Sequence, residues 1–443
     1  MYRDPFSKIH DVAVFGGGLC GIGTALALSG KGKKIIIVER RPQIGWEITS
    51  AFVCEFGEDV SHAAKEIRAA LELTGGYKKN LISPPVAEIC LSELMKKKNV
   101  DVLLYSYPLQ LITNKGLACG VVTGSKSGKQ VIRARTFVDA TEEAVLWEPS
   151  GIEFRKTGLK TYRYTIVFNG IKKRIGKYSL PAGKNQVIDI EIKPSVWKGE
   201  CNVEFKVKEP SISRARLAVP EVISFVRKQV PQLRDAIVTH TAFELFPDDV
   251  PQYFAEKKHL RHPKIGNLFC SGMWAIPDTA ERKERNSVTG RIATGEETGV
   301  LLQKSFNEYR RHTPETPGFV HSSVKDRHTS DVVIAGGGTA GALAAIASAR
   351  NRVKTSLIES STMLGGMGTG GGIHAYYHGV AGGLQDEVDE RVGRMAPLFC
   401  GEYGVHGFHP EAKKVILEQI CAEAGVQIFY GTTAIGVEMR AGG

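Results

Sequence analysis

Two glycine-rich stretches constrain the fold of this chain more than any other feature of its sequence. The clearer one runs from Thr329 to Gly372 and opens with a short apolar run, Asp331 to Ala335, as expected for a buried parallel strand. Gly336, Gly338 and Gly341 follow with the spacing G-x-G-x-x-G. The first glycine allows a tight turn, the second lets a pyrophosphate approach the backbone, and the third lets a helix pack close to the strand. The stretch therefore predicts a strand, a turn and a helix that bind a dinucleotide.

The residues after this helix distinguish between nicotinamide and flavin. A second apolar run, Thr355 to Ile358, leads to Glu359, whose carboxylate is placed to accept hydrogen bonds from a ribose diol. The N-terminus of the helix directs free N–H groups and a positive dipole end at the phosphates. Another glycine-rich loop, Leu364 to Gly371, would lie across the far end of the same cofactor. Nicotinamide sites do not require such a loop, so the sequence favours a flavin dinucleotide.

An earlier stretch of the chain repeats this pattern in the same register. Gly16, Gly18 and Gly21 have the spacing described above, and Glu39 ends the apolar run that follows them. Each of these residues precedes its counterpart by 320 positions, as Gly16 precedes Gly336. Because the correspondence continues through a further helix into the next strand, we interpret the two stretches as an internal duplication.

At these residues the chain resembles the FAD-dependent oxidoreductase family with a glutathione-reductase-like FAD domain, the group related to fumarate reductase and succinate dehydrogenase flavoproteins. The matching pattern is D-V-V-I-A-G-G-G-T-A-G, then I-E, then L-G-G-M-G-T-G-G, then H-P at the start of a helix. In that family the loop after the acidic residue contacts the pyrophosphate and the flavin. The resemblance therefore implies FAD contacts for Gly365, Gly366 and Thr369.

The earlier copy departs from the family pattern where a flavin would lie. Its loop, Ile44 to Ser50, keeps one glycine and the threonine but adds bulk and a carboxylate at Trp46 and Glu47. Family members usually show D-A-T-G-D at a later position, whereas this chain ends that segment with Glu142 and Glu143. We expect an intact phosphate turn and an altered flavin loop in this copy.

Later segments resemble the part of the family that returns to the FAD domain. An N-L-F-x-x-G segment ends at Gly272, and the helix expected after it contains Thr294 and Gly295. The resemblance assigns these three residues to the cofactor. The N-terminal amides of that helix would then stabilise negative charge on a reduced flavin.

The resemblance also implies a domain organisation and a fold class. The expected fold is α/β: a Rossmann-like FAD/NAD(P)-binding domain with a parallel sheet, an inserted mixed β/α substrate domain and a second, partial Rossmann-like domain. A helix is expected at about 220–230 in the insertion, from apolar residues at helical spacing. The expected parts are the first half of an FAD-binding domain at 1–150, an inserted substrate or cap domain at 151–265, the returning half at 266–312, a linker at 313–330, and a second, incomplete FAD-binding unit at 331–443.

In the given sequence the second unit contains only the first of the short strands that we expect after its Rossmann-like part. It has no counterpart of the D-A-T or N-L-F-x-x-G segments. Half of such a domain leaves parallel strands with open edges and an uncovered core. We therefore hypothesise that the chain is part of a longer protein, or that a partner chain supplies the missing half.

Composition excludes several other classes of protein. The net charge is +11, but the basic residues are scattered, so we expect no nucleic-acid role and a surface suited to an anionic cofactor or a carboxylate substrate. The eight cysteines show no C-x-x-C spacing, which predicts reduced thiols, a cytoplasmic location and no metal site. The polar N-terminus and the short apolar runs predict neither a signal peptide nor a membrane span.

Three histidines are candidates for the catalytic base. His374 and His378 directly follow the flavin-type loop, and their spacing of four places them on one face of a helix or a strand. They are either a base and a flavin contact, or polar residues with purely structural partners. His240 lies four residues before Glu244 in the expected substrate region, with the same two interpretations.

The sequence thus predicts an FAD-dependent oxidoreductase that transfers hydride or electrons between FAD and a small organic substrate, with His374 or His240 taking the proton. One alternative is a two-nucleotide enzyme with FAD in one unit and NAD(P)H in the other. A second alternative is a noncatalytic flavoprotein subunit that acts as a scaffold for a partner.

Overall fold

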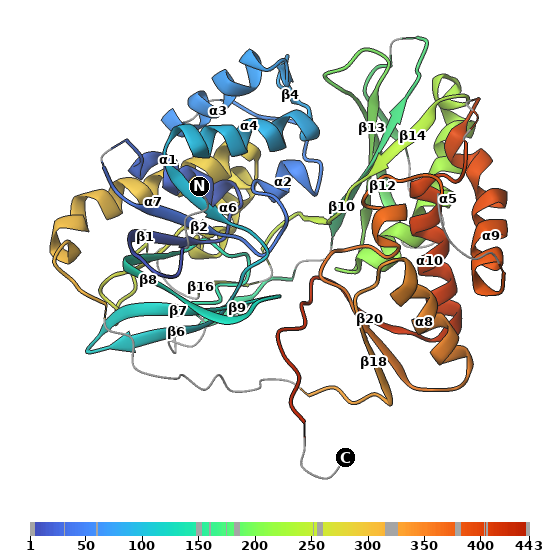
Figure 1. Ribbon diagram of the computed structural model, residues 1–443. Coiled ribbons are helices and arrows are strands. Elements are labelled where there is room, and N and C mark those ends of the chain that lie inside the picture. Colours follow the sequence, from blue (N-terminus) through green and yellow to red (C-terminus); the bar gives the residue numbers. More distant parts are fainter. Residues whose placement is uncertain are drawn as a thin grey trace. The chain divides into compact units, whose positions relative to one another are not determined.

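The computed structural model groups the chain into two compact units. The first contains the described parts of residues 1–159, 247–324 and 435–443, and the second contains those of 160–246 and 325–434 (Figure 1). The residues described are 5–30, 32–58, 61–147, 153–158, 161–173, 175–180, 187–250, 252–254, 260–314, 327–376, 382–402, 404 and 406–439.

The first unit combines a central sheet with helices from both ends of its sequence. Its strands are β1 (Ile9–Phe15), β2 (Ile35–Val38), β3 (Tyr77–Lys78), β4 (Leu81–Ile82), β5 (Val100–Leu103), β6 (Tyr107–Asn114), β7 (Leu117–Ser125), β8 (Gly128–Asp139), β9 (Phe154–Lys156), β16 (Gln252–Phe254) and β17 (Leu268–Cys270). Its helices are α1 (Leu19–Leu28), α2 (Trp46–Thr49), α3 (His62–Leu73), α4 (Pro84–Lys97), η3 (Met273–Ala275), α6 (Thr279–Arg285) and α7 (Val288–Tyr309).

The main sheet of this unit is parallel in its centre and antiparallel at one side. The strand order is β5-β2-β1-β8-β7-β6, with β17 paired to β8. β1 runs parallel to β2 and β8, whereas β7 runs antiparallel to both β6 and β8. This is the expected α/β fold with a parallel-containing sheet.

Side-chain alternation along β1 places a core on each face of the sheet. Val12 and Val14 belong to the core beneath α1, α3 and α4, and Ala13 and Phe15 belong to the core on the other face. A parallel strand covered on both faces is apolar at every position, which explains the continuous apolar run in the sequence.

The second unit contains two sheets. Its strands are β10 (Tyr162–Asn169), β11 (Tyr178–Leu180), β12 (Val187–Pro194), β13 (Cys201–Val207), β14 (Ile237–Thr241), β18 (Val332–Ala335), β19 (Thr355–Ile358) and β20 (Gln427–Phe429), with β15 (Phe246–Pro247) at the boundary of the units. Its helices are α5 (Ile212–Gln229), η2 (Pro231–Leu233), α8 (Thr339–Arg350), η4 (Gly366–Gly368), α9 (Leu384–Cys400) and α10 (Pro410–Ala424).

The grouping of the second unit differs from the expected division of the chain. The antiparallel sheet β11-β12-β13-β10-β14 and the parallel sheet β18-β19-β20 belong to one compact unit. In this unit α10 packs against α5, α8 and α9 (Figure 1). We expected an inserted substrate or cap domain at 151–265. Its residues 161–246 group with the second glycine-rich segment, whereas β9 pairs with β16 in the first unit.

Helix α5 begins earlier than predicted. We expected a start near residue 220, where a proline often opens a helix, but Pro220 lies inside α5. The side chain of Ser211 accepts a hydrogen bond from the backbone N–H of Arg214, at 3.3 Å, and so caps the helix. The first residue of α5, Ile212, lies eight residues before the predicted start.

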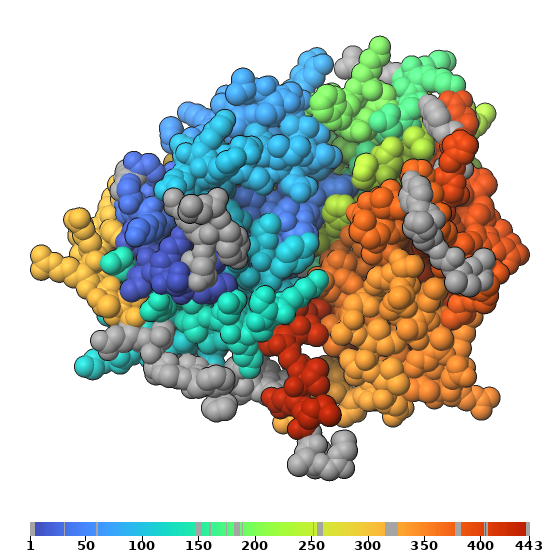
Figure 2. Space-filling view, viewed as in Figure 1, coloured from blue at the N-terminus to red at the C-terminus, as the bar shows by residue number. Residues whose placement is uncertain are grey.

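One edge of the three-stranded parallel sheet is open. β18 pairs only with β19 among the described strands, whereas its counterpart β1 pairs with both β2 and β8. The side chain of Val333 in β18 is 58% exposed, and every residue of the α8 helix except Ala342, Ala345 and Ile346 is at least partly accessible. Residues 330–370 form a broad surface of this unit in Figure 2, where they are orange.

Among the described residues, no helix has both the length and the apolar character needed to cross a bilayer.

Candidate functional site

The glycine turn of the second unit joins β18 to α8. Gly336 has a φ of +102°, which only glycine adopts without strain. A Cβ atom on Gly341 would lie 1.8 Å from the carbonyl oxygen of Gly336, so the first turn of α8 can approach the strand only because residue 341 has no side chain. The predicted roles of the first and third glycines are therefore visible in the backbone geometry.

The carboxylate of Glu359 fixes the end of β19 against this turn. One of its oxygens accepts a hydrogen bond from the N–H of Gly337 at 2.6 Å, and the other accepts one from the N–H of Ser361 at 2.6 Å. Glu359 is partly exposed and lies beside the glycine turn. Its position matches that of the acidic residue in a dinucleotide site.

The second glycine-rich loop packs directly onto the turn. The N–H of Gly365 donates to the carbonyl of Gly337 at 2.9 Å, and the hydroxyl of Thr369 donates to the carbonyl of Leu364 at 2.5 Å. A Cβ atom on Gly366 would lie 3.1 Å from the Cα atom of Gly338. The structure thus brings together Gly336, Gly338, Gly341, Glu359, Gly365, Gly366 and Thr369, all seven residues predicted for the cofactor in this unit. We call this group the second cradle.

The space in front of the second cradle is open. A Cβ atom on Gly338 would meet no atom within 4 Å. Gly338 is the N-cap residue of α8 and has no side chain that could cap the helix. An open helix N-terminus beside glycines binds phosphate through free N–H groups and a favourable dipole, so these residues fit the pyrophosphate of a dinucleotide.

The first unit has the same backbone arrangement, which we call the first cradle. Gly16 has a φ of +103°, and a Cβ atom on Gly21 would lie 1.9 Å from the carbonyl oxygen of Gly16. The N–H of Gly17 donates to Glu39 at 2.5 Å, and the N–H of Gly45 donates to the carbonyl of Gly17 at 2.7 Å. Gly16, Gly18, Gly21 and Glu39 are thus arranged like their counterparts 320 positions later.

Side chains fill the space in front of the first cradle. Both carboxylate oxygens of Glu47 lie 3.1 Å from the N–H of Leu19, the first residue of α1. A Cβ atom on Gly18 would lie 2.9 Å from the indole nitrogen of Trp46. The cavity that remains in front of the turn has a volume of about 80 Å³. The residues present at the first cradle therefore do not fit a dinucleotide, because pockets for such ligands have volumes of about 300–1,000 Å³.

The electrostatics of the first cradle are set by the buried carboxylate of Glu47, the partly exposed carboxylate of Glu142 and the guanidinium of Arg291. Burial raises the pKa of Glu47 to about 7, against the opposing effect of Arg291. Burial also raises the pKa of Glu142, again opposed by Arg291. Nearby, burial raises the pKa of Asp139 to about 6, although Thr141 and Leu146 donate hydrogen bonds to its carboxylate.

The resemblance assigned three residues of the segment 266–312 to the cofactor, and the structure places all three in contact with other parts of the protein. A Cβ atom on Gly295 would lie 1.9 Å from the carbonyl oxygen of Cys20, so this glycine allows α7 to approach α1. The hydroxyl of Thr294 donates to the carbonyl of Gly290 within α7, at 2.9 Å. A Cβ atom on Gly272 would overlap the indole of Trp274. The contacts of Gly272, Thr294 and Gly295 in the structure are therefore with protein atoms of the first unit.

Two of the three predicted catalytic histidines, His374 and His240, are exposed in the second unit. His374 is exposed, and its carbonyl accepts a hydrogen bond from the N–H of Phe408 at 2.8 Å. His240 is exposed on β14, opposite Val167 in β10. His378 lies outside the described residues.

Sequence reasoning missed two buried basic residues. Arg291 is 1% exposed and lies in the first turn of α7, where the helix dipole disfavours a cation. In the sequence, an arginine in the first turn of an expected helix therefore indicates that an acidic residue lies close to it in the folded protein. Lys413 is 2% exposed in α10, and its amino group lies 3.1 Å from the position of a Cβ atom on Gly368, in the glycine-rich loop. Burial lowers the pKa of Lys413, and its amino group also donates a hydrogen bond to the hydroxyl of Tyr376.

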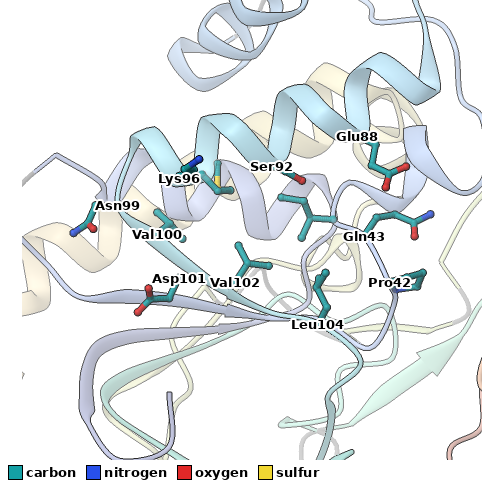
Figure 3. A pocket seen from close by; sticks show the side chains of 12 residues that line it. Pro42, Gln43, Glu88, Ser92, Lys96, Asn99, Val100, Asp101, Val102 and Leu104 are labelled. Carbon is teal, nitrogen blue, oxygen red and sulfur yellow. The ribbon is translucent and has the colours of Figure 1, made fainter. Parts of the chain in front are cut away.

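A separate cavity of about 390 Å³ lies between α4 and β5 in the first unit. In Figure 3, Gln43 and Glu88 lie at one end of this cavity, Asn99 and Asp101 lie at the other, and Val102 lies between them. It shares no residue with the glycine turn of the first cradle. Among the described residues, no group of three or more His, Cys, Asp or Glu side chains is arranged to hold a metal ion.

Solved structures resemble this chain in fold. A geranylgeranyl bacteriochlorophyll reductase-like protein from Thermoplasma acidophilum aligns with a TM-score of 0.50 and 15% identity, over 68% of this chain and 79% of that protein. The p-nitrophenol 4-monooxygenase of Pseudomonas putida gives a TM-score of 0.49 and 15% identity, over 68% and 81% of the two chains. A flavoprotein/dehydrogenase from Cytophaga hutchinsonii gives 0.48 and 16% identity, over 68% and 79%. No curated protein sequence matches this chain.

A protein-family model shows to which family this chain belongs. The model described as FAD dependent oxidoreductase matches residues 11–165 and 331–443, more than half of the chain. The matched segments include both cradles. The chain therefore belongs to the FAD-dependent oxidoreductase family, and its cofactor is FAD.

Proposed function

We propose that this protein transfers hydride or electrons between a small organic substrate and an FAD molecule held in the second cradle. The observation that carries this proposal is the open N-terminus of α8 beside Gly338, with the second glycine-rich loop packed on the turn. When bound there, FAD would supply the redox chemistry, and the protein would position it and the substrate.

Each residue of the second cradle has a distinct proposed task. Gly336 and Gly338 would allow the backbone to approach the pyrophosphate, and the free N–H groups of α8 would bind it. Glu359 would accept hydrogen bonds from the ribose. Gly365, Gly366 and Thr369 would shape the loop against the flavin end of the cofactor, since the hydroxyl of Thr369 holds the loop closed.

The exposed imidazole of His374 is the proposed proton acceptor. His374 follows the glycine-rich loop, and its backbone is anchored through the N–H of Phe408. An accessible imidazole can act as a general base for a bound substrate. His240 and His378 are the secondary candidates for the same task.

Replacing Gly338 by Asp tests the site directly. An added Cβ meets open space, so the fold should tolerate Gly338→Asp, whereas its carboxylate would occupy the phosphate position and repel the pyrophosphate. We expect the wild-type protein to retain FAD after gel filtration and Gly338→Asp to lose at least nine-tenths of it, on the order of 1.4 kcal/mol or more in binding free energy. The measurement is the 450 nm absorbance of flavin per chain.

Gly393→Asp is the matched control, since Gly393 lies in α9 and a Cβ atom there also meets open space. This variant should retain FAD at the wild-type level. Full FAD retention by Gly338→Asp, with an unchanged circular dichroism spectrum, would exclude the second cradle as the site.

An NAD(P)H site in the other unit is less well supported. It would require an open first cradle, whereas Glu47 and Trp46 fill the space in front of that turn. Bleaching of the flavin absorbance by stoichiometric NADPH would favour this alternative. A noncatalytic scaffold role would be favoured if bound FAD could be reduced neither by NADPH nor by candidate hydroxylated or carboxylated substrates.

We also propose that the two cradles arose by duplication and that additional polypeptide completes the second unit. The repeated hydrogen bonds at Gly17 and Gly337 support the first idea. The open edge of β18 and the exposed side chain of Val333 support the second, because β8 covers the corresponding edge of β1 in the first unit. A native mass spectrum that shows only the single chain for the protein isolated from its own cells would argue against a partner.

Two finer assignments also belong to this proposal. The parallel strands followed by the antiparallel strands β6 to β8 support a glutathione-reductase-like FAD domain of the fumarate reductase and succinate dehydrogenase type. A cytoplasmic location is supported by the cysteines, since all eight are buried and the described residues form no disulfide, as in proteins of reducing compartments. Fluorescence microscopy of a tagged protein would test the location.

A further inference from the structure

We infer that the protein's own Trp46 and Glu47 side chains close the first cradle to dinucleotides, so that each chain takes up FAD at the second cradle only. The expectation of one FAD molecule per chain rests on the proposed function, which assigns FAD to the second cradle. The closure of the first cradle rests on contacts within the first unit alone.

The carboxylate of Glu47 occupies the place of an anionic ligand. Both of its oxygens lie 3.1 Å from the N–H of Leu19 at the start of α1. In a dinucleotide-binding fold this helix N-terminus faces the pyrophosphate. The terminal N–H group of α1 therefore already has a hydrogen-bond partner within the protein, the carboxyl group of Glu47.

Arg291 holds this carboxyl group in place. Its guanidinium lies 3.3 Å from Glu47 and 3.5 Å from Glu142, and Asn286 accepts two further hydrogen bonds from it, at 2.8 and 3.1 Å. The indole N–H of Trp46 donates to Glu142 at 3.1 Å. The side chains of Arg291 and Glu47 are each 1% exposed. Displacing Glu47 would separate a buried ion pair, which is strongly unfavourable.

A pyrophosphate would also meet unfavourable charge at this site. Glu47 and Glu142 place two carboxylates against a single guanidinium. An ionised carboxylate repels a phosphate charge, and the repulsion is stronger in partly buried sites, where the effective dielectric constant is lower. The remaining cavity of about 80 Å³ is also too small for the ligand.

The second cradle serves as an internal control for this inference. The residues 320 positions after Trp46 and Glu47 are Gly366 and Met367. Gly366 has no side chain, and the side chain of Met367 is 65% exposed. Since the two cradles share their backbone hydrogen bonds, the occupied space in the first cradle results from these substitutions together with Arg291 and Glu142.

Hydrogen–deuterium exchange of the wild-type protein, with and without saturating FAD, tests the inference without any mutation. We expect FAD to slow exchange in peptides covering 336–341 and 364–369, and to leave peptides covering 16–21 and 45–49 unchanged within error. Protection of 16–21 or 45–49 would overturn the inference. No protection in either cradle would overturn the proposed site at Gly338 while supporting closure of the first cradle.

Counting bound FAD provides an independent measurement. We expect one FAD per wild-type chain after dialysis against FAD, and less than a tenth of that for Gly338→Asp. Two FAD molecules per chain, or one in Gly338→Asp, would mean that the first cradle binds the cofactor. If Gly338→Asp does not fold, the exchange experiment and the wild-type stoichiometry still decide the question.

Discussion

At the scale of single residues, the two cradles differ in a few side chains on a common backbone. Glu39 and Glu359 accept the equivalent hydrogen bonds from Gly17 and Gly337, at 2.5 and 2.6 Å. The functional difference comes from position 47, where a carboxylate replaces the methionine of the second copy. A carboxylate at a helix N-terminus is favourable in itself, but here it is buried and shares Arg291 with Glu142.

The stability of the first unit should depend on pH through Glu47. Burial raises the pKa of Glu47 in the folded protein from its ordinary 4.5 to about 7. Between these values the folded state binds a proton that the unfolded state has released, so this contribution is full below pH 4.5 and is lost as the pH rises through 7. We expect Glu47 to lower the free energy of unfolding by about 2 kcal/mol between pH 5 and pH 8.

Glu47→Gln is the matched variant for this prediction. The amide has no proton to lose, so its unfolding free energy should fall less between pH 5 and pH 8 than that of the wild type. Urea denaturation followed by tryptophan fluorescence at both pH values gives the two slopes. Asp139 is present in both proteins and cancels in the comparison. An equal fall in the free energy of unfolding between pH 5 and pH 8 for the two proteins would contradict a raised pKa at Glu47.

At the scale of elements, a buried ion pair joins α5 to α10 in the second unit. The guanidinium of Arg216 in α5 lies 2.6 Å from the carboxylate of Glu418 in α10 and donates to the carbonyl of Thr362 at 2.6 Å. The side chains of Arg216 and Glu418 are each 2% exposed. Such contacts explain why residues 161–246 pack with the second glycine-rich segment.

Removing only one member of this pair should destabilise the second unit. Arg216→Met leaves Glu418 buried without its counter-ion, and we expect a loss of about 3–5 kcal/mol in the free energy of unfolding. The double variant Arg216→Met with Glu418→Met should recover most of that loss, since it leaves no buried charge. Urea denaturation followed by circular dichroism is the measurement.

Arg214 provides the control on the same helix. Its guanidinium pairs with Glu209, and both side chains are 48% exposed. Arg214→Met should therefore change the free energy of unfolding by less than about 1 kcal/mol. Equal losses for Arg214→Met and Arg216→Met would show that the buried pair has no special contribution.

At the scale of the whole molecule, the chain consists of two units with separate cores, and the proposed FAD site belongs to one of them. Three of the four tryptophans, Trp46, Trp147 and Trp274, are buried in the first unit, and Trp197 is in the second. Tryptophan fluorescence therefore reports mainly on the first unit, whereas circular dichroism reports on both.

We expect FAD to stabilise only the second unit. At a concentration 100-fold above its Kd, a ligand stabilises the folded state by about 2.7 kcal/mol, which raises the melting temperature of a domain of this size by about 5 °C. The melting transition seen by circular dichroism but not by tryptophan fluorescence should move by this amount, and the fluorescence transition should not move. A shift of the tryptophan transition, or a single shared transition, would contradict this expectation.

The sequence by itself determined the family, the cofactor and the backbone of both glycine turns. These features depend on residues close together in the chain: Gly336 adopts a φ of +102°, and Gly341 leaves room for the carbonyl of Gly336. The altered loop at Trp46 and Glu47 was also visible in the sequence, although its consequence was not.

Only the tertiary structure decided which distant side chains meet. Arg291 reaches Glu47 because α7 packs on α1 through Gly295, and Arg216 reaches Glu418 because α5 packs on α10. No local propensity encodes such contacts, since each depends on the path of the chain between two segments far apart in sequence. Glycine spacing therefore predicted two cradles of the same shape, and long-range packing made one of them closed and left the other open.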